Sequence, residues 1–280
     1  MQKTDPSAYA YLPYQPGFEQ YPDYRNYVVP AGHPLFNIVS DFYQFSVKSK
    51  TETKICVIPD GCADIIFRYG ENGVTKTIER SLREKQVFTI SEEGCAFGVR
   101  FLPGRMTSVI NVYAAELMAC DIPLMDVLKK DPLLDKMEEA FSFEERINLM
   151  SRYLITRLSG PNASQGLVRY CTGKIFAQNG NVSIAELASE TGYTSRYVRE
   201  VFCKNVGLSP KELSEIIQFQ KSFFDYASRW KRNNIVSLCD MAQLYGYYDQ
   251  SHMNKTYRKM AGCLPKKLFS EIYSGACAAL

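Results

Sequence analysis

The chain has 280 residues, 46% of them hydrophobic and 22% charged, with a net charge of +3, a balance typical of globular proteins that bury a core. It contains no run of about eighteen uncharged apolar residues and starts without an apolar segment, so we expect neither a transmembrane helix nor a secretory signal. Nine scattered cysteines without a Cys-x-x-Cys pair, and only two histidines, favour a reducing compartment and argue against a disulfide framework or a metal centre.

The front of the chain is predicted to be an extended arm followed by strands. Residues 1–35 hold six prolines and six tyrosines, too many ring constraints for a helix. From residue 36 onward, short β-rich runs separated by PDG, ENG and EEG turns favour a β-sandwich or a small cupin-like barrel. Helices are expected at about 106–119, 123–130 and 143–158. Residues 1–160 are therefore predicted to form a β-rich regulatory or sensor domain with trailing helices.

Two closely similar phrases follow, SIAELASETGY at 183–193 and SLCDMAQLYGY at 237–247. In each, a serine precedes a carboxylate by three positions, which is the capping box of a helix start, and apolar residues then recur at helical spacing. Gly192 or Gly246 stands where that helix ends. Helix, glycine turn and second helix form a helix-turn-helix unit, so the chain is predicted to contain two such units.

Each unit is followed by a matched phrase, GLSPKEL at 207–213 and GCLPKKL at 262–268. Ser209 as cap and Pro210 at the first position begin a long linking helix, expected over about 210–228 and about 28 Å long. Such a helix would hold two recognition helices about one turn of DNA apart. This part of the chain is also basic, since residues 165–280 carry 15 Lys and Arg against 9 Asp and Glu.

Residues 167–273 resemble the AraC/XylS family of bacterial transcription regulators, with two helix-turn-helix units, a long linking helix, G-x-S-P after the first unit and G-x-x-P after the second. Leu264 replaces the usual hydroxyl residue, and Tyr247 and Tyr257 replace the usual phenylalanines, departures that affect capping and core shape. The resemblance implies an all-α DNA-binding domain over 165–280 and an α+β multi-domain chain.

The resemblance and the outward helix faces also assign residues to DNA. The base-contacting positions fall on Arg196, Arg199, Glu200, Gln250, Ser251, His252, Asn254 and Lys255. Arginine suits guanine, glutamine and asparagine suit adenine, and glutamate accepts from cytosine. Phosphate contacts are expected from Thr194, Lys204, Arg258, Lys259, Lys266 and Lys267. An ordinary solvated helix face is the competing interpretation for the two arginines.

VIPDGCADIIF at 57–67 and FGVRFLPGR at 97–105 resemble an uncharacterised sensor-type domain that precedes AraC-type halves. An effector site there would draw on Phe42, Tyr43, Asp64, Phe67, Arg100 and Arg105. The PDG triplet at 59–61 is more simply a reverse turn. Because side chains alternate along a strand, Arg100 lies opposite Phe97 and Phe101, and either face could line a pocket.

Together these patterns predict a sequence-specific DNA-binding transcriptional regulator in the bacterial cytoplasm, associated with the nucleoid. Its expected partners are double-stranded DNA, a small effector, RNA polymerase and a second copy of the chain, with no cofactor, metal or membrane. In the alternative, the front domain is a protein-interaction module without a small ligand. An enzyme is not expected, since no Gly-rich phosphate loop, nucleophile elbow or activated thiol is present in the sequence.

Overall fold

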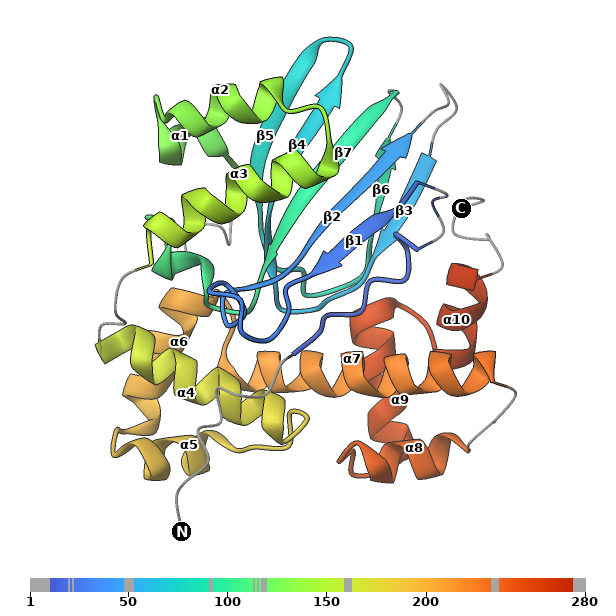
Figure 1. The fold of residues 1–280 in the computed structure, drawn as a ribbon. Coiled ribbons are helices and arrows are strands. Elements are labelled where there is room, and N and C mark those ends of the chain that lie inside the picture. The colour runs from blue at the N-terminus through green and yellow to red at the C-terminus, as the bar shows by residue number, and fades with distance from the viewer. Residues whose placement is uncertain are drawn as a thin grey trace.

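The computed structural model describes residues 11–19, 21, 23–47, 53–90, 93–112, 114, 116, 120–158, 163–232 and 237–273. The front of the chain forms an antiparallel β domain, and the rear forms a layer of helices beneath it (Figure 1). This is the α+β arrangement that the sequence predicts. Within the described ranges, no helix is both long and apolar enough to cross a membrane.

The β domain consists of two antiparallel sheets. The larger has the order β1-β2-β7-β4-β5-β8, and the smaller pairs β3 with β6. The strands of the larger sheet are β1 Arg25–Val28, β2 Val39–Val47, β4 Ala63–Gly70, β5 Gly73–Glu79, β7 Gly94–Phe101 and β8 Ile122–Pro123. The smaller sheet contains β3 Thr53–Val57 and β6 Gln86–Ile90. No ladder between described residues joins the two sheets, so the domain is an open sandwich rather than a closed barrel.

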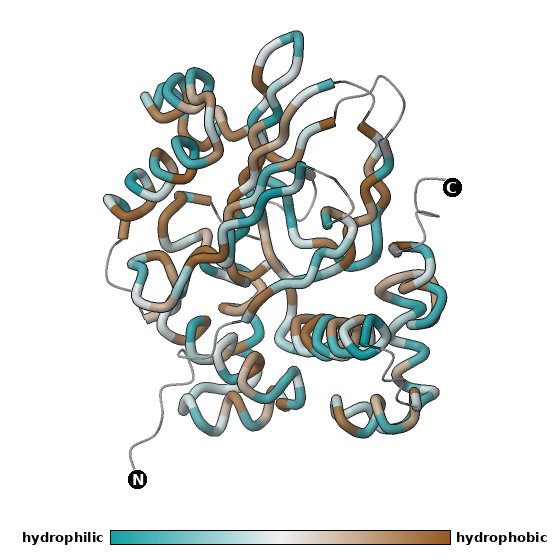
Figure 2. Tube along the Cα trace, turned by 45° about the vertical axis from the view of Figure 1, so that its right-hand side comes forward, coloured by the Kyte–Doolittle hydropathy of each residue, from teal (hydrophilic) through white to brown (hydrophobic). Residues whose placement is uncertain are grey.

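Alternation along the strands gives the larger sheet two different faces. One face carries Phe42, Phe67 and Phe97 and forms a core with the trailing helices. The trailing helices are α1 Leu124–Leu128, α2 Pro132–Glu139 and α3 Phe143–Thr156, which lie across this face in Figure 1. The other face carries Tyr43 and Arg100 and turns toward the smaller sheet. Figure 2 shows the resulting pattern, with long hydrophobic stretches along the central strands and mixed residues along the helices.

The trailing helices differ in part from the expectation. The helix expected at 106–119 was wrong: Met106–Ser108 form a short 3-10 turn, η2, none of the described residues in this range is α-helical, and residues 113, 115 and 117–119 lie outside the described residues. The helix at 143–158 is confirmed as α3, and the one at 123–130 is shortened to α1. Helix α2 was not expected. Asp131 caps it by accepting a hydrogen bond from the Leu133 backbone N–H, and Pro132 follows at the first helical position.

The rear of the chain forms seven helices among the described residues. They are α4 Ala163–Ala177, α5 Ile184–Thr191, α6 Ser195–Val206, α7 Pro210–Lys231, α8 Leu238–Leu244, α9 Gln250–Ala261 and α10 Pro265–Tyr273. Their buried side chains form one cluster that also includes Tyr11, Ile58 and Leu102 from the front of the chain. The two parts of the molecule therefore share a core.

The described part of the predicted N-terminal arm lies between the two parts of the molecule. Tyr11 stacks on Phe176 of α4 with ring centroids 4.9 Å apart. Further along, Phe18 stacks on Tyr43 of β2 at 5.3 Å. Residues 1–10 of the expected arm lie outside the described residues. The described part of the arm thus contacts both the helical layer and the larger sheet.

Candidate nucleic-acid interface and internal cavity

The first helix-turn-helix unit consists of α5 and α6, and its local signals act as the sequence predicts. The Ser183 hydroxyl accepts a hydrogen bond from the Glu186 backbone N–H at 3.1 Å, and Gly192 ends α5 at φ +73°. Thr194 caps α6 through the Tyr197 backbone N–H at 3.2 Å. The Glu186 carboxylate does not complete the expected capping box. It contacts Lys174 and Gln178 of α4 instead, which ties α5 to α4.

The second unit consists of α8 and α9 and repeats the same geometry. Asp249 caps α9 by accepting from the His252 backbone N–H at 2.7 Å. The two tyrosines that replace phenylalanine are both buried, and their hydroxyls meet Ser222 of α7, at 3.3 Å from Tyr247 and 2.9 Å from Tyr257. Burial raises the pKa of both phenols, so both stay neutral. The extra oxygens therefore join the second unit to the linking helix.

Helix α7 connects the two units. It begins with the predicted capping box, in which Ser209 and Glu212 satisfy each other's backbone groups, and it continues to Lys231 rather than ending near 228. Its 22 residues correspond to about 33 Å, close to one turn of DNA. In Figure 1, α6 lies beside the start of α7 and α9 crosses α7 near its middle, where Tyr257 packs on Phe219 and Phe223, with α5 and α8 on the side away from the β domain.

The residues expected to contact bases lie mostly in the open. Arg199, Glu200, Gln250, Ser251, His252 and Lys255 are exposed, and the Arg196 side chain is 88% exposed. Arg196 and Glu200 form an ion pair at 2.9 Å along one face of α6. Asn254 is the exception, because it is only half-exposed and its side-chain oxygen is buried without a hydrogen-bond partner in the described part of the chain.

His252 is oriented by its own turn. Its Nδ1 accepts a hydrogen bond from the Tyr248 backbone N–H at 3.3 Å, so a neutral imidazole carries its proton on Nε2 and presents a donor outward. Tyr248 itself is 93% exposed. The sequence analysis gave this tyrosine no role, although an aromatic residue directly before the α9 cap Asp249 is a visible signal in the sequence.

The expected phosphate contacts are also at the surface, but some already have partners. Thr194, Lys204, Arg258, Lys259, Lys266 and Lys267 are all exposed. Lys259 pairs with Glu215 of α7 at 2.6 Å, and Lys267 lies 3.7 Å from Glu271. Tyr193, at the end of the first repeated phrase, is 44% exposed and packs on Tyr197 with ring centroids 4.8 Å apart.

A separate feature of the front domain is a cavity of 180 Å³ between the two sheets. Of the six residues predicted for an effector site, Tyr43, Asp64 and Arg100 line it. Phe42 and Phe67 do not reach it, since alternation places them in the core on the opposite face of the sheet. Arg105 does not reach it either: it is buried against α4 and donates to Thr172 at 2.9 Å. Burial lowers the pKa of Arg105 to about 10.

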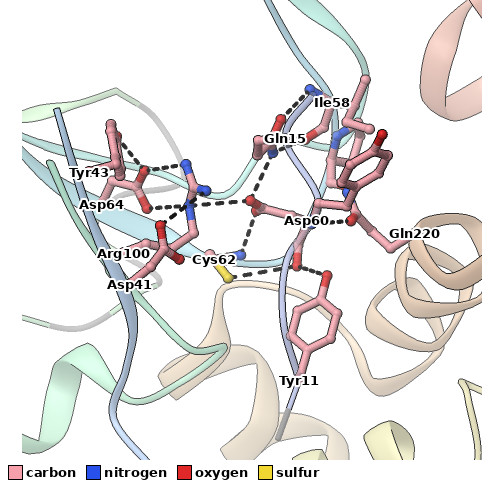
Figure 3. Close-up of polar contacts among 12 residues, drawn as sticks. Tyr11, Gln15, Asp41, Tyr43, Ile58, Asp60, Cys62, Asp64, Arg100 and Gln220 are labelled. Atoms are coloured by element: carbon pink, nitrogen blue, oxygen red, sulfur yellow. Dashed lines mark hydrogen bonds and ion pairs between the residues drawn. The ribbon is translucent and has the colours of Figure 1, made fainter. Parts of the chain in front are cut away.

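Arg100 is the polar centre of this cavity, and Figure 3 shows it surrounded by three aspartates. It donates to both Asp64 oxygens, at 3.3 and 3.0 Å, and lies 3.6 Å from Asp60 and 3.9 Å from Asp41. The Tyr43 ring covers its guanidinium at 4.8 Å. Burial disfavours the charge of Arg100, but the aspartates outweigh this effect and hold its pKa well above the usual range.

Burial raises the pKa of the two less well-paired carboxyls in this cluster, to about 6 for Asp41 and upward for Asp60. One buried cation among three carboxyl groups leaves an excess of acidic groups.

The PDG triplet does more than reverse the chain. The Pro59 carbonyl accepts a hydrogen bond from the Gln220 side chain of α7 at 2.7 Å, and Gly61, at φ +78°, lies against Leu213 of the same helix. The Asp60 carboxylate accepts from Gln15 at 2.8 Å while it lines the cavity (Figure 3). The turn therefore has the cavity on one side and the linking helix on the other. No single-sequence signal pairs residues 59 and 220.

A second connection runs through the loop between β5 and β6. Arg80, Leu82 and Gln86 line the cavity. Between them, Arg83 contacts Glu212 at 3.1 Å and the Gly207 carbonyl at 3.4 Å, at the junction of α6 and α7. The Lys85 backbone N–H donates a hydrogen bond to the Met260 carbonyl of α9, and the Lys85 side chain forms an ion pair with Glu271 of α10 at 2.9 Å. One loop thus touches the C-terminal ends of both predicted recognition helices.

Comparisons with known proteins give limited matches. Residues 27–123, less than half of the chain, match the family described as Domain of unknown function (DUF6597). No curated protein matches the sequence at a significant level. Among solved structures, the chain is similar to ToxT from Vibrio cholerae. Against the apo form of a ToxT variant, the identity is 10% and the TM-score 0.39, over 81% of this chain and 96% of that one.

Against wild-type ToxT bound to an unsaturated fatty acid, the identity is 10% and the TM-score 0.37, over 83% of this chain and 95% of that one. Against ToxT bound to (E)-4-(8-methylnaphthalen-1-yl)but-3-enoic acid, the identity is 9% and the TM-score 0.31, over 89% and 98%. At these values the similarity assigns no function. Among the described residues, no group of three or more His, Cys, Asp and Glu is arranged to hold a metal ion.

Proposed function

We propose that the chain is a sequence-specific DNA-binding transcriptional regulator of the AraC/XylS type, with a regulatory domain over 1–160 and a DNA-binding domain over 165–280. One observation carries the proposal: two helix-turn-helix units, each with side-chain-capped helices, a positive-φ glycine turn and a buried apolar face, pack at separate places along one long helix, α7. A single chain then offers recognition helices to two successive major grooves. A homodimer, RNA polymerase contact and a bacterial cytoplasmic location belong to the same proposal.

The charges and the exposure of α6 and α9, the second helix of each unit, favour this function over the competing interpretation of an ordinary solvated helix face. Each places long polar side chains at its N-terminal end, where recognition helices contact base edges. Arg196 holds Glu200 in an ion pair, which orients both side chains across the face of α6. The outward Nε2 of His252 supplies a fixed donor on α9. Arg199 is exposed, and an exposed arginine can donate to the edge of a guanine base.

The front domain is proposed to regulate this binding through the cavity. Two described segments line the cavity and also contact the rear helices, namely the PDG triplet at 59–61 and the loop at 80–85. An occupant that shifts either segment changes its contacts with α7, α9 or α10. A small effector therefore has a physical route to the two recognition helices.

The test begins with purified full-length protein and a pool of random DNA duplexes, from which bound sequences are enriched. Arg199→Ala is expected to cost about 1–3 kcal/mol on the enriched sequence and much less on random DNA. Lys267→Ala is expected to weaken both alike, because a phosphate contact carries no sequence information. Fluorescence anisotropy with labelled duplexes measures both affinities.

Arg152→Ala, which removes an exposed arginine from α3 of the front domain, serves as the charge control and is expected to change neither affinity. Failure of the wild-type protein to enrich any sequence would overturn the proposed function. Equal losses for Arg199→Ala on enriched and random DNA would overturn its base-reading role alone.

A thermal-shift screen against small molecules separates an effector domain from a protein-interaction module, since a ligand that binds only the folded state raises Tm. The full chain is needed for this screen because the front domain shares its core with the rear helices.

A further inference from the structure

The cavity between the sheets has the size of a one-ring ligand. Its volume is 180 Å³, against about 150 Å³ for an apolar protein cavity that binds benzene. Aromatic and aliphatic side chains from both sheets and from the arm form its walls, among them Phe18, Tyr43, Phe45, Phe88, Ile55 and Ile66. Its polar end is the cluster around Arg100. An occupant therefore needs an apolar body and one polar group.

The Arg100 guanidinium is already occupied on every side. Its N–H groups point to Asp64 and lie near Asp60 and Asp41, and its faces are covered by Tyr43 and Phe18, at 4.8 and 5.8 Å from the ring centroids. A ligand carboxylate would have to displace an aspartate from Arg100 and then lie beside it. Two carboxylates confined together repel each other strongly in a buried site.

The unmatched groups of the cluster are acidic. Fully ionised, Arg100 with three aspartates carries a formal charge of −2, and neither oxygen of the buried Asp41 accepts a hydrogen bond of normal geometry among the described residues. At the rim, Arg68 is paired with Glu79, while the Arg80 backbone N–H donates to Asp121. The raised pKa of Asp60 is the electrostatic sign of the same excess, because burial without enough positive charge favours the neutral acid.

We propose that this cavity binds a small amphipathic cation, an amine on a body of about one aromatic ring, with its ammonium beside Asp60 and its ring against the apolar walls that Phe45, Phe88 and Ile55 form. The aromatic walls add cation–π attraction to the apolar burial of the ring. Only the regulatory role of such a ligand rests on the proposed function. The chemical class of the ligand follows from the cavity itself. Cation binding favours ionised Asp60, so it releases protons and strengthens as the pH rises through the raised pKa of Asp60.

Three isosteric probes test the sign of the ligand charge: 2-phenylethylamine, 2-phenylethanol and phenylacetate, each titrated into full-length protein by calorimetry at pH 7.5. The amine is expected to bind at least about tenfold more tightly than the carboxylate, since like charges side by side cost several kcal/mol. The neutral alcohol should lie between them. Phenylacetate binding as tightly as the amine, or no measurable binding of any probe, would overturn the inference.

Two variants locate the binding. Asp60→Asn is expected to weaken the amine about tenfold and the alcohol less than about twofold, whereas Asp126→Asn, on exposed α1, is expected to change neither. Ala96→Leu on β7 fills part of the cavity and is expected to weaken all three probes. If Asp60→Asn fails to fold, the probe ranking in wild type and the Ala96→Leu result still decide. Unchanged binding in Ala96→Leu places the probe elsewhere and overturns the inference.

DNA binding measured on the same preparations keeps the two proposals apart. Intact binding to the enriched duplex with no preference for the amine rejects the ligand class and leaves the proposed function standing. Selective binding of the amine without DNA binding rejects the proposed function and leaves the ligand class standing.

Discussion

At the scale of single residues, the Asp41 carboxyl is the least well-satisfied acid in the front domain. It is 2% exposed and faces Arg100 of β7 at 3.9 Å, with Asp64 and Asp60 nearby, and burial raises its pKa to about 6. An unfolded chain would titrate the same group near 3.9. The folded protein therefore holds this proton more tightly, and the free energy of unfolding falls as the pH rises from about 4 to 6.

Asp41→Asn removes that titration while it keeps the shape of the side chain. The variant is expected to be more stable than wild type above pH 7, by about 1–3 kcal/mol, and the difference should vanish below about pH 4. Urea unfolding at pH 4, 6 and 8 measures the difference. Asp126→Asn, at an exposed position, should follow wild type at every pH. An Asp41→Asn protein less stable than wild type at pH 8 would contradict this account.

At the scale of elements, the linking helix α7 has two functions. It packs against both helix-turn-helix units, and it supports the PDG turn of the front domain through Leu213 in its first turn and Gln220 near its middle. Gln220 also accepts from the Tyr14 backbone N–H at 2.8 Å, which adds the arm to the same junction. A change in the turn is therefore transmitted directly to the helix that spaces the recognition helices.

Gly61→Ala tests this junction. At φ +78° any side chain is strained by about 1–2 kcal/mol, and a methyl group would lie 2.6 Å from the Leu213 Cδ1 atom. Gly32→Ala provides the comparison, since Gly32 also has a positive φ, +90°, but nothing lies within 4 Å of the added carbon. Thermal unfolding is expected to show a clearly larger drop in Tm for Gly61→Ala. An equal decrease in Tm for the two variants would mean that the Leu213 side chain moves aside without destabilising the protein.

At the scale of the whole molecule, the loop at 80–85 contacts the ends of both helix-turn-helix units: the Arg83 side chain donates to the Gly207 carbonyl after α6, and the Lys85 backbone N–H donates to the Met260 carbonyl of α9. The same loop borders the cavity. Allosteric coupling between two sites is typically worth about 1–3 kcal/mol, and rearranging one or two such contacts is enough to supply it.

Arg83→Gln is expected to reduce the change in DNA affinity caused by 2-phenylethylamine while the affinity for the amine stays the same. Arg83 is 51% exposed, so its loss should lower global stability by less than about 1 kcal/mol. Anisotropy with and without the amine measures the coupling. Arg25→Gln breaks a comparable surface pair with Glu144, away from the helical layer, and should leave the coupling intact. Unchanged coupling in Arg83→Gln would exclude this loop as the route.

Local patterns in the sequence were enough to predict the two helix-turn-helix units. Thr194, Ser209 and Asp249 cap the helices they precede, and Gly192 ends its helix, because these interactions involve residues only a few positions apart. The alternation of side chains along a strand likewise predicted that Arg100 and Phe97 lie on opposite faces of β7. The exposure of Tyr193 and the length of α7 depend on neighbouring elements, and there the local pattern was incomplete.

The cavity and its connections were decided by the tertiary structure alone. Gln15, Asp60, Arg100 and Gln220 lie far apart in the chain, and their contacts depend on strand register, on the arm inserting between the two parts and on the docking of α7. The sequence by itself determined which residues are able to cap a helix, turn the chain or present a charge. Burial of three aspartates around one arginine, and the acidic excess that follows, arise only when distant segments exclude water together.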